Sequence, residues 1–322
     1  MTLYSIQSNK GTLNCKKVMF PSWLLSLIVL FAVNGSVFSA PASISTPFSD
    51  IHLHFNWDQK EIISAQEVVK KLKENNVVLA TVSSVPSHLA LELSDAGGSW
   101  LQPFFSPYLS VGHRERWFLD EMVLVKAKQG LASGRYLGIG ELHLWSGFRP
   151  RRDNKILKGL LTLAEEYQVP FLIHTEASSH LFLTPLCQQY PKVKFLWAHA
   201  GGRLKAKSVK KLMQQCPNVW VEMSVRDPWR YNTLVDDKNQ LLPGWRELLI
   251  QYQDRFMTGT DPVWNVTKGQ SWSQADEGWA HYTELLAFHR QWLKQLPPEV
   301  ELKIRLNNAK LFLKAEKNEP IN

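Results

Sequence analysis

The chain has 322 residues, of which 44% are hydrophobic and 20% charged, and this balance is too apolar for intrinsic disorder. Its length suits one large domain, because α/β barrels take about 250 residues. The net charge of +8 is modest and the Lys and Arg residues are dispersed, which argues against a nucleic-acid-binding surface.

The first 42 residues differ in composition from the rest of the chain. Lys10, Lys16 and Lys17 come first with no acidic residue, an apolar run follows over 20–33, and small residues end the segment at Ala40-Pro41-Ala42. This order is typical of a secretory signal peptide, so we expect residues 1–42 to be removed and 43–322 to form one domain. The apolar run is short for a membrane span of about 20 residues, so we expect no stable membrane insertion after cleavage.

A signal peptide predicts export, to a periplasmic or secreted location where disulfides form. Cys15 lies in the signal segment, which leaves Cys187 and Cys216 in the mature chain. Two cysteines without a CxxC spacing leave their pairing open.

From residue 48 onward, short β-rich runs alternate with helical stretches, and this alternation is typical of a parallel sheet. The number of predicted strands is the number that a closed (β/α)8 TIM barrel needs. We therefore predict an α/β fold of a single domain, with strands at 48–55, 77–84, 101–106, 136–143, 169–175, 193–199, 218–224 and 255–260.

The helical stretches carry apolar residues at intervals of three and four, as expected of helices that pack one face on a barrel. Ser64 followed by Glu67 predicts a capping box at the first helix. Only a short helix is expected between Pro86 and Ser99, and 225–244 is predicted to be a long loop. The remaining helices are expected over 117–131, 156–167, 204–215, 245–252 and 279–293.

The first predicted strand carries the motif Asp50-Ile51-His52-Leu53-His54. Side chains two apart share a face of a strand, so this spacing directs both imidazoles, with Asp50 deeper, into the barrel and Ile51 and Leu53 outward. Two imidazoles from one strand can bind a divalent metal, although an HxH motif alone is a weak signal.

Four other predicted strands end in a residue that can bind metal: Glu141, His174, His199 and Asp261. A single buried His or Glu is commonly a structural residue. Charged and imidazole groups at the ends of nearly all these apolar strands would be unfavourable without partners, and a shared metal removes that cost. Together with His52 and His54, they predict a metal centre at the C-terminal ends of the strands.

These residues resemble the motifs of the amidohydrolase superfamily, and within it the amidohydrolase-2, or amidohydrolase-related, group. The resemblance spans about residues 48–315. It is carried by DIHLH at 50–54, IHTE at 173–176, AHAGG at 198–202 and GTDPVW at 259–264, in the family's order, and by LNNAKLF at 306–312, which is similar to its closing helix. It implies a barrel hydrolase that uses divalent metal, zinc first, with iron, manganese or nickel as alternatives.

Glu141 departs from the pattern of many two-metal members, which place a carboxylated lysine at this position. It is similar instead to the TatD-type branch, where a glutamate in a GxGE sequence is a metal ligand. The resemblance leaves open whether one or two ions bind. It also leaves His199 as either a metal ligand or a catalytic group.

A divalent metal makes water acidic enough to attack at neutral pH. The resemblance implies that Asp261 takes the proton of that water and passes it to the leaving group. Loops at the strand ends form the rim of a barrel's active site, and four rim residues are candidates for binding an anionic, partly aromatic small molecule: Arg203, Arg226, Trp145 and Trp264.

The leading interpretation is an exported hydrolase of a small ester, lactone, amide or related substrate. Three alternatives stay open: decarboxylation of a small carboxylic acid, a TatD-like nuclease, and a non-enzymatic binding protein. The dispersed basic residues disfavour the nuclease. The complete set of six candidate site residues disfavours the binding protein. The sequence predicts no oligomeric state.

Overall fold

The computed structural model describes residues 46–144, 150–175, 179–263 and 276–313. The predicted signal peptide lies outside these residues. Among the residues that are described, no helix is both long and apolar enough to cross a membrane.

Within the described residues, eight strands lie where the sequence predicts them, and they form two parallel sheets, one of β1, β2 and β3 and one of β4 to β8. Most of their side chains are buried, as expected of parallel strands covered by helices. The bounds are β1 (Phe48–His54), β2 (Val77–Ser83), β3 (Leu101–Phe104), β4 (Ile139–His143), β5 (Phe171–His174), β6 (Phe195–Trp197), β7 (Val219–Glu222) and β8 (Phe256–Met257).

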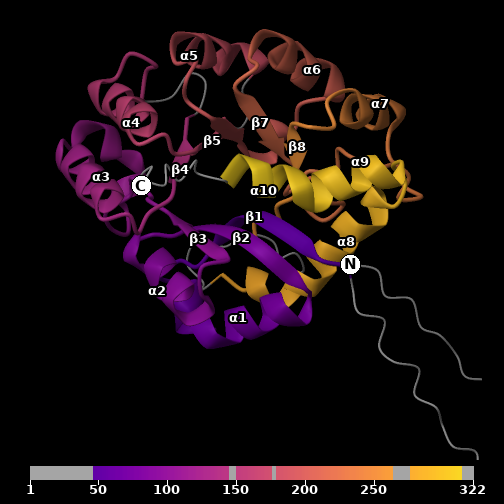
Figure 1. The fold of residues 1–322 in the computed structure, drawn as a ribbon, viewed down its shortest axis with the longest axis horizontal. Helices are drawn as coiled ribbons and strands as arrows, with labels where there is room; N and C mark the ends of the chain where they lie inside the picture. Colours follow the sequence, from indigo (N-terminus) through magenta and orange to yellow (C-terminus); the bar gives the residue numbers. More distant parts are fainter. Residues whose placement is uncertain (1–45, 145–149, 176–178, 264–275, 314–322) are drawn as a thin grey trace, which may run out of the picture. The chain divides into compact units, whose positions relative to one another are not determined.

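Backbone hydrogen bonds connect the two sheets where β3 meets β4 and where β8 meets β1. Phe105 N donates to Gly138 O at 2.8 Å and Gly140 N donates to Phe105 O at 2.9 Å. Ile51 N donates to Thr258 O at 3.0 Å. The result is an α/β arrangement with the strands at the centre and helices around them (Figure 1).

The predicted helices are present, and the capping box at Ser64 and Glu67 is formed. The sequence missed the short α5 and α9, whose segments lack a full apolar repeat. The long loop after β7 contains no helix or strand until α7 begins. The helices are α1 (Ala65–Glu74), α2 (His88–Gly97), α3 (Met122–Ala132), α4 (Lys155–Glu166), α5 (Thr184–Gln189), α6 (Ala206–Gln215), α7 (Pro243–Gln251), α8 (Tyr282–Leu293), α9 (Pro298–Leu302) and α10 (Asn308–Leu313).

The predicted alternation of β1 is wrong at its first half. The register of β1 against β2 shifts between Asp50 and Leu53, as at a β-bulge. Ile51 therefore packs with inward-facing residues of other strands, among them Leu172 and Met257, rather than outward. Asp50 points instead to α8, where Tyr282 Oη donates to its Oδ2 at 2.9 Å. Only after this shift do His52 and His54 follow the expected pattern.

The C-terminal segment closes the interior of the strands. Phe312 of α10 packs on the inward side chains of the strands, including Leu172, Leu196 and Met257. Its ring lies 5.1 Å from the ring of Trp220 of β7. In Figure 1, α10 lies in front of the strands at the centre, so these apolar residues fill the end opposite the polar strand ends.

Cys187 of α5 and Cys216, which follows α6, form a disulfide with their Cα atoms 5.8 Å apart. The pairing that the sequence left open is therefore made in the structure. It joins two helices of the outer layer.

Candidate metal centre

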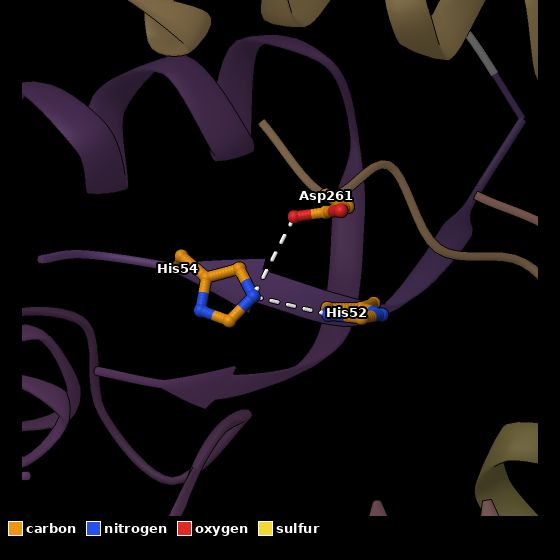
Figure 2. A group of neighbouring side chains, drawn as sticks. All are labelled: His52, His54 and Asp261. Atoms are coloured by element: carbon orange, nitrogen blue, oxygen red, sulfur yellow. Dashed lines mark hydrogen bonds and ion pairs between the residues drawn. The ribbon is translucent and has the colours of Figure 1, made fainter. Parts of the chain in front are cut away.

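The six residues predicted to bind metal lie together, and all are buried. Two groups drawn from these six have ligand atoms within 4.8 Å of one another: His52, His54 and Asp261, and Glu141, His174 and His199. A third such group joins Glu222 to His52 and His199. Glu141 Oε2 lies 3.3 Å from His54 Nε2, and Asp261 Oδ2 lies 3.7 Å from His199 Nε2, so the groups adjoin. Figure 2 shows His54 facing both His52 and Asp261.

Hydrogen bonds to Nδ1 set the orientation of both β1 imidazoles. His54 Nδ1 donates to Ser83 O at 2.8 Å, and His52 Nδ1 donates to Glu222 Oε1 at 2.9 Å. A carbonyl and a carboxylate only accept, so each proton sits on Nδ1 and each Nε2 lone pair is available to a metal. The two Nε2 atoms lie 3.1 Å apart and face the same point.

Glu222, at the end of β7, is the functional residue that the sequence analysis missed. It is fully buried and accepts a hydrogen bond from His199 N at 2.6 Å as well as from His52. Ser224 Oγ donates to Glu222 at 3.0 Å and accepts from His199 Nδ1 at 2.6 Å. Glu222 therefore orients the His52 ring directly, and it orients His199 through the backbone N and through Ser224. The signal was available, because Glu222 follows an apolar run just as Glu141 does.

Ser83, at the end of β2, holds Glu141. Its hydroxyl accepts from Glu141 N at 2.6 Å and donates to Gly140 O. Burial alone would raise the pKa of the Glu141 carboxyl, but the imidazoles that face it, with the charge of His52 and the hydrogen bond from His174 among their effects, hold that pKa well below its usual value. Glu141 is therefore a carboxylate at neutral pH.

An unpaired carboxylate oxygen tests whether these residues suit a metal. Asp261 Oδ1 is buried, has no hydrogen-bond partner within the described part of the chain, and lies 3.5 Å from His54 Nε2. Burying such an oxygen unsatisfied costs about 1–3 kcal/mol or more. A cation between it and the imidazole nitrogens removes that cost, and a set of N and O donors suits zinc and its neighbours. The residues present fit a divalent metal.

The charge balance points the same way. Burial opposes protonation of His52, yet the negative charges of Glu141, Glu222 and Asp261 hold its pKa well above the usual value. Carboxylates that raise the pKa of a fully buried imidazole make a site that favours positive charge. A divalent cation supplies that charge.

His143 lies at the edge of this centre. Its backbone N donates to Tyr108 Oη at 2.8 Å, and Tyr108 Oη donates in turn to His143 Nδ1 at 2.9 Å. Its Nε2 lies 3.5 Å from Glu141 Oε2, and its ring stacks on His174 at 4.4 Å. Burial, together with the charge of Arg114, lowers the pKa of His143 well below its usual value, so its ring is neutral.

The predicted substrate-binding residues separate into three groups. Arg226 is fully buried and donates to backbone oxygens of 199, 200 and 204, so its assignment to substrate is wrong. Arg203 is exposed, with its Cζ 5.0 Å from the ring centre of Tyr231, whose ring lies 6.4 Å from that of His199. Trp145 and Trp264 lie outside the described residues.

The sequence profile of the family described as Amidohydrolase matches residues 128–314, which is more than half of the chain. The chain belongs to the amidohydrolase family. Amidohydrolases are metal-dependent hydrolases, and this enzyme is one of them. The matched residues carry all the candidate ligands except His52 and His54 of β1.

Two solved structures share the fold of this amidohydrolase. One, provisionally assigned as a 2-pyrone-4,6-dicarboxylic acid hydrolase from Pseudomonas putida, is 14% identical, with a TM-score of 0.54 over 83% of this chain and 97% of that one. The other, an amidohydrolase from Burkholderia multivorans with bound HEPES, is 13% identical, with a TM-score of 0.52 over 83% and 99%. No curated protein matches the sequence.

Proposed function

We propose that this amidohydrolase is exported and hydrolyses a small ester, lactone, amide or related bond with divalent metal, zinc first, which the six buried residues would hold, with Glu141 as the ligand that two ions would share. The observation that carries the proposal is the position of Glu141 between two sets of imidazoles. Its similarity to the TatD-type glutamate suggested a ligand, and the distances suggest a bridge.

The two oxygens of Glu141 face different histidines. Oε2 lies 3.3 Å from His54 Nε2 and 3.6 Å from His52 Nε2. Oε1 lies 2.8 Å from His174 Nδ1 and 3.6 Å from His199 Nε2. Asp261 repeats this division, since its Oδ1 lies near His54 and its Oδ2 near His199. His199 would then be a ligand of a second ion.

A bound divalent metal makes water more acidic and polarises the bond to be cleaved. The protein supplies the proton transfer: the Asp261 carboxylate accepts the proton of the attacking water and returns it to the leaving group. Glu222 and Ser83 keep the β1 imidazoles turned toward the reaction by binding Nδ1 of each ring. The neutral His143, at the edge of the centre, can donate a hydrogen bond to substrate.

An anionic substrate is a narrower part of the proposal. Arg226 and Arg230 are both committed to protein acceptors, so they do not contribute to anion binding. Arg203 is exposed above Tyr231, which borders His199, and it is the described arginine that we propose for this contact. A guanidinium there would bind a carboxylate of the substrate.

The proposal of export rests on the signal-like segment 1–42 and is supported by the disulfide between Cys187 and Cys216. Disulfides persist in the periplasm and outside the cell. Fractionation of expressing cells, with mass measurement of the mature chain, tests this part. A cytoplasmic, full-length chain would overturn it.

We also propose that the eight strands act as one closed barrel, so that all the strand ends face a common centre. The hydrogen bonds from Phe105 and Ile51 across the two junctions support this. A closed barrel predicts strong and similar amide protection for β1, β4 and β8 in hydrogen exchange. Rapid exchange at either junction would contradict closure.

Metal content is the central test. Mature protein purified without chelator is expected to hold up to about two equivalents of metal and to lose its activity on chelation. His54→Ala should weaken metal binding about 100–1,000-fold. The exposed His88 of α2 offers a matched control, since His88→Ala removes an imidazole away from the centre. Less than about half an equivalent in the wild type, with no activity gained on metal addition, would overturn the proposal.

The reaction is tested on panels of esters, lactones and amides, with and without a carboxylate. Hydrolysis that His54→Ala loses and His88→Ala keeps supports the proposal. Release of carbon dioxide from small carboxylic acids without hydrolysis would instead establish the decarboxylase. Metal-dependent degradation of DNA would establish the nuclease.

A further inference from the structure

Two of the candidate ligands stand in left-handed backbone, just beyond the ends of their strands. The φ angle is 55° at His199 and 48° at Asp261. This region costs an L-residue about 1–2 kcal/mol. Neither residue is a glycine, so the surroundings must hold both backbones in place.

The first of these turns follows β6 and is held by Arg226. Arg226 Nε donates to His199 O at 2.8 Å, and Nη2 donates to Ala200 O at 2.9 Å and to Leu204 O at 3.0 Å. The guanidinium is fully buried, lies 4.2 Å from the ring centre of Trp245, and donates through Nη1 to Thr233 Oγ1 at 2.9 Å. Four hydrogen bonds thus fix it between the turn and its own loop.

The second turn follows β8 and is held by Arg230. Arg230 Nη1 donates to Asp261 O at 2.6 Å, and Nη2 donates to Thr260 O at 2.9 Å. Its Nε donates to Asp227 Oδ2 at 2.8 Å, and both side chains of this ion pair are almost fully buried. Asp261 N donates to His52 O at 2.8 Å on the other side, so the peptide groups flanking Asp261 are held from two directions.

Both arginines come from one segment, the loop of residues 223–242 between β7 and α7. We infer that Arg226 and Arg230 are positioning residues, which hold the backbones of His199 and Asp261 and so aim their side chains at the metals. Within the described residues, the hydrogen bonds of both arginines go to backbone carbonyls, Thr233 and Asp227, and not to the side chain of a candidate ligand. This inference rests on the proposed function, because it treats His199 and Asp261 as ligands.

The chemistry of arginine explains why the loop uses this residue. A guanidinium donates in a rigid planar fork and can bridge successive carbonyl oxygens, whereas the ammonium of lysine is a point donor. Arg226 bridges carbonyls of 199, 200 and 204, and Arg230 bridges those of 260 and 261. Lysine keeps the charge but cannot make these bonds together.

Arg255 provides a matched control. It precedes β8, at the end of the strand opposite the metal centre, and donates to Cys216 O at 2.8 Å and Met213 O at 2.7 Å. Its Cζ lies 5.1 Å from the ring centre of Tyr252. It is therefore an arginine that grips backbone carbonyls and packs on an aromatic ring without touching a ligand turn.

The test compares Arg226→Lys, Arg230→Lys and Arg255→Lys in the mature protein, using cobalt(II) as the probe. The dissociation constant is measured by competition with a chelator, the coordination geometry by visible absorption, and the stability of the metal-free protein by thermal unfolding. We expect the first two variants to weaken cobalt binding about 10–100-fold and to change the absorption spectrum. Arg255→Lys should lower thermal stability but keep the wild-type affinity and spectrum.

Two results would overturn the inference. If Arg226→Lys and Arg230→Lys lose only thermal stability, as Arg255→Lys does, the arginines are structural and the proposed function stands. If the wild type binds no cobalt, the proposed function fails, and the inference with it.

Two milder variants keep the test decisive if a lysine variant does not fold. Thr233→Val removes one acceptor of Arg226, and Asp227→Asn removes the charge that pairs with Arg230, while both arginines remain. We expect each to weaken cobalt binding in the same direction, by a smaller factor. Wild-type affinity in both folded variants would contradict the inference.

Discussion

The metal ligands of β1 and those beyond β6 and β8 are held in different ways. His52 and His54 lie inside a strand, where the strand backbone, with its register shift after Asp50, sets the direction of each side chain and only Nδ1 needs a partner. His199 and Asp261 lie past the strand ends in left-handed backbone, and buried groups distant in sequence hold their peptide groups. The first pair depends on local geometry and the second on tertiary contacts.

This difference predicts which substitutions should affect metal binding in each region. In the β1 region, substitution of the ligand itself should weaken metal binding most, because the strand keeps its conformation without that side chain. In the β6 and β8 region, residues that never face the metal should matter as well. Four variants, taken in order of decreasing expected effect, test this contrast.

Removing a β1 ligand should have the largest effect. A four-ligand zinc site is worth about 10–16 kcal/mol, or about 3–4 kcal/mol per ligand, so His54→Ala should weaken zinc binding about 100–1,000-fold. Thermal stability of the metal-free protein should change little, because the strand remains. Competition with a chelator and thermal unfolding measure the two. A metal-free variant that does not fold would show that β1 is not locally determined.

The disulfide should affect stability and leave the centre unchanged. Cys187 and Cys216 are separated by 29 positions, and closing a loop of that size is worth about 3–4 kcal/mol. The double variant Cys187→Ser with Cys216→Ser should lose that much stability in chemical denaturation and keep its metal affinity. A parallel loss of metal affinity would mean that the outer helices, and not Arg226, hold the turn after β6.

Glu222 links the two regions, since it binds His52 Nδ1 and His199 N. Glu222→Gln keeps the shape and removes the charge, and we expect metal binding to weaken about 10–100-fold. Glu247→Gln, an exposed residue of α7, is the control and should have no effect. Isothermal titration with zinc measures both. Unchanged affinity in Glu222→Gln would show that the histidines need no carboxylate behind them.

The smallest effect is expected from removing one hydrogen bond to Asp50, whose carboxylate connects β1 to the backbone beside Asp261. It accepts hydrogen bonds from Thr260 N at 2.9 Å, Thr260 Oγ1 at 2.7 Å and Tyr282 Oη. Tyr282→Phe removes one of these and should lower stability by about 1 kcal/mol. Metal affinity should stay close to that of the wild type, because the Thr260 bonds remain. A large loss of affinity would show that the two regions are strongly coupled.

Much of the centre could be predicted from local pattern. Apolar runs that end in Glu141, His174, His199 and Asp261 indicate strand ends, and parallel strands place those ends at one edge. The alternation of His52 and His54 indicates a shared face, although the register shift before them could not be read from side-chain types. Glu222 fits the same rule and could have been found with it.

The order of the elements and the identity of the converging residues could be predicted from the sequence, because periodicity and strand ends are local properties. The hydrogen bonds of Arg226 and Arg230 to backbone carbonyls instead of substrate, and the turn of Asp50 toward α8, depend on how distant segments pack. The direction of a loop arginine depends on acceptors contributed by other strands. No local pattern contains that information.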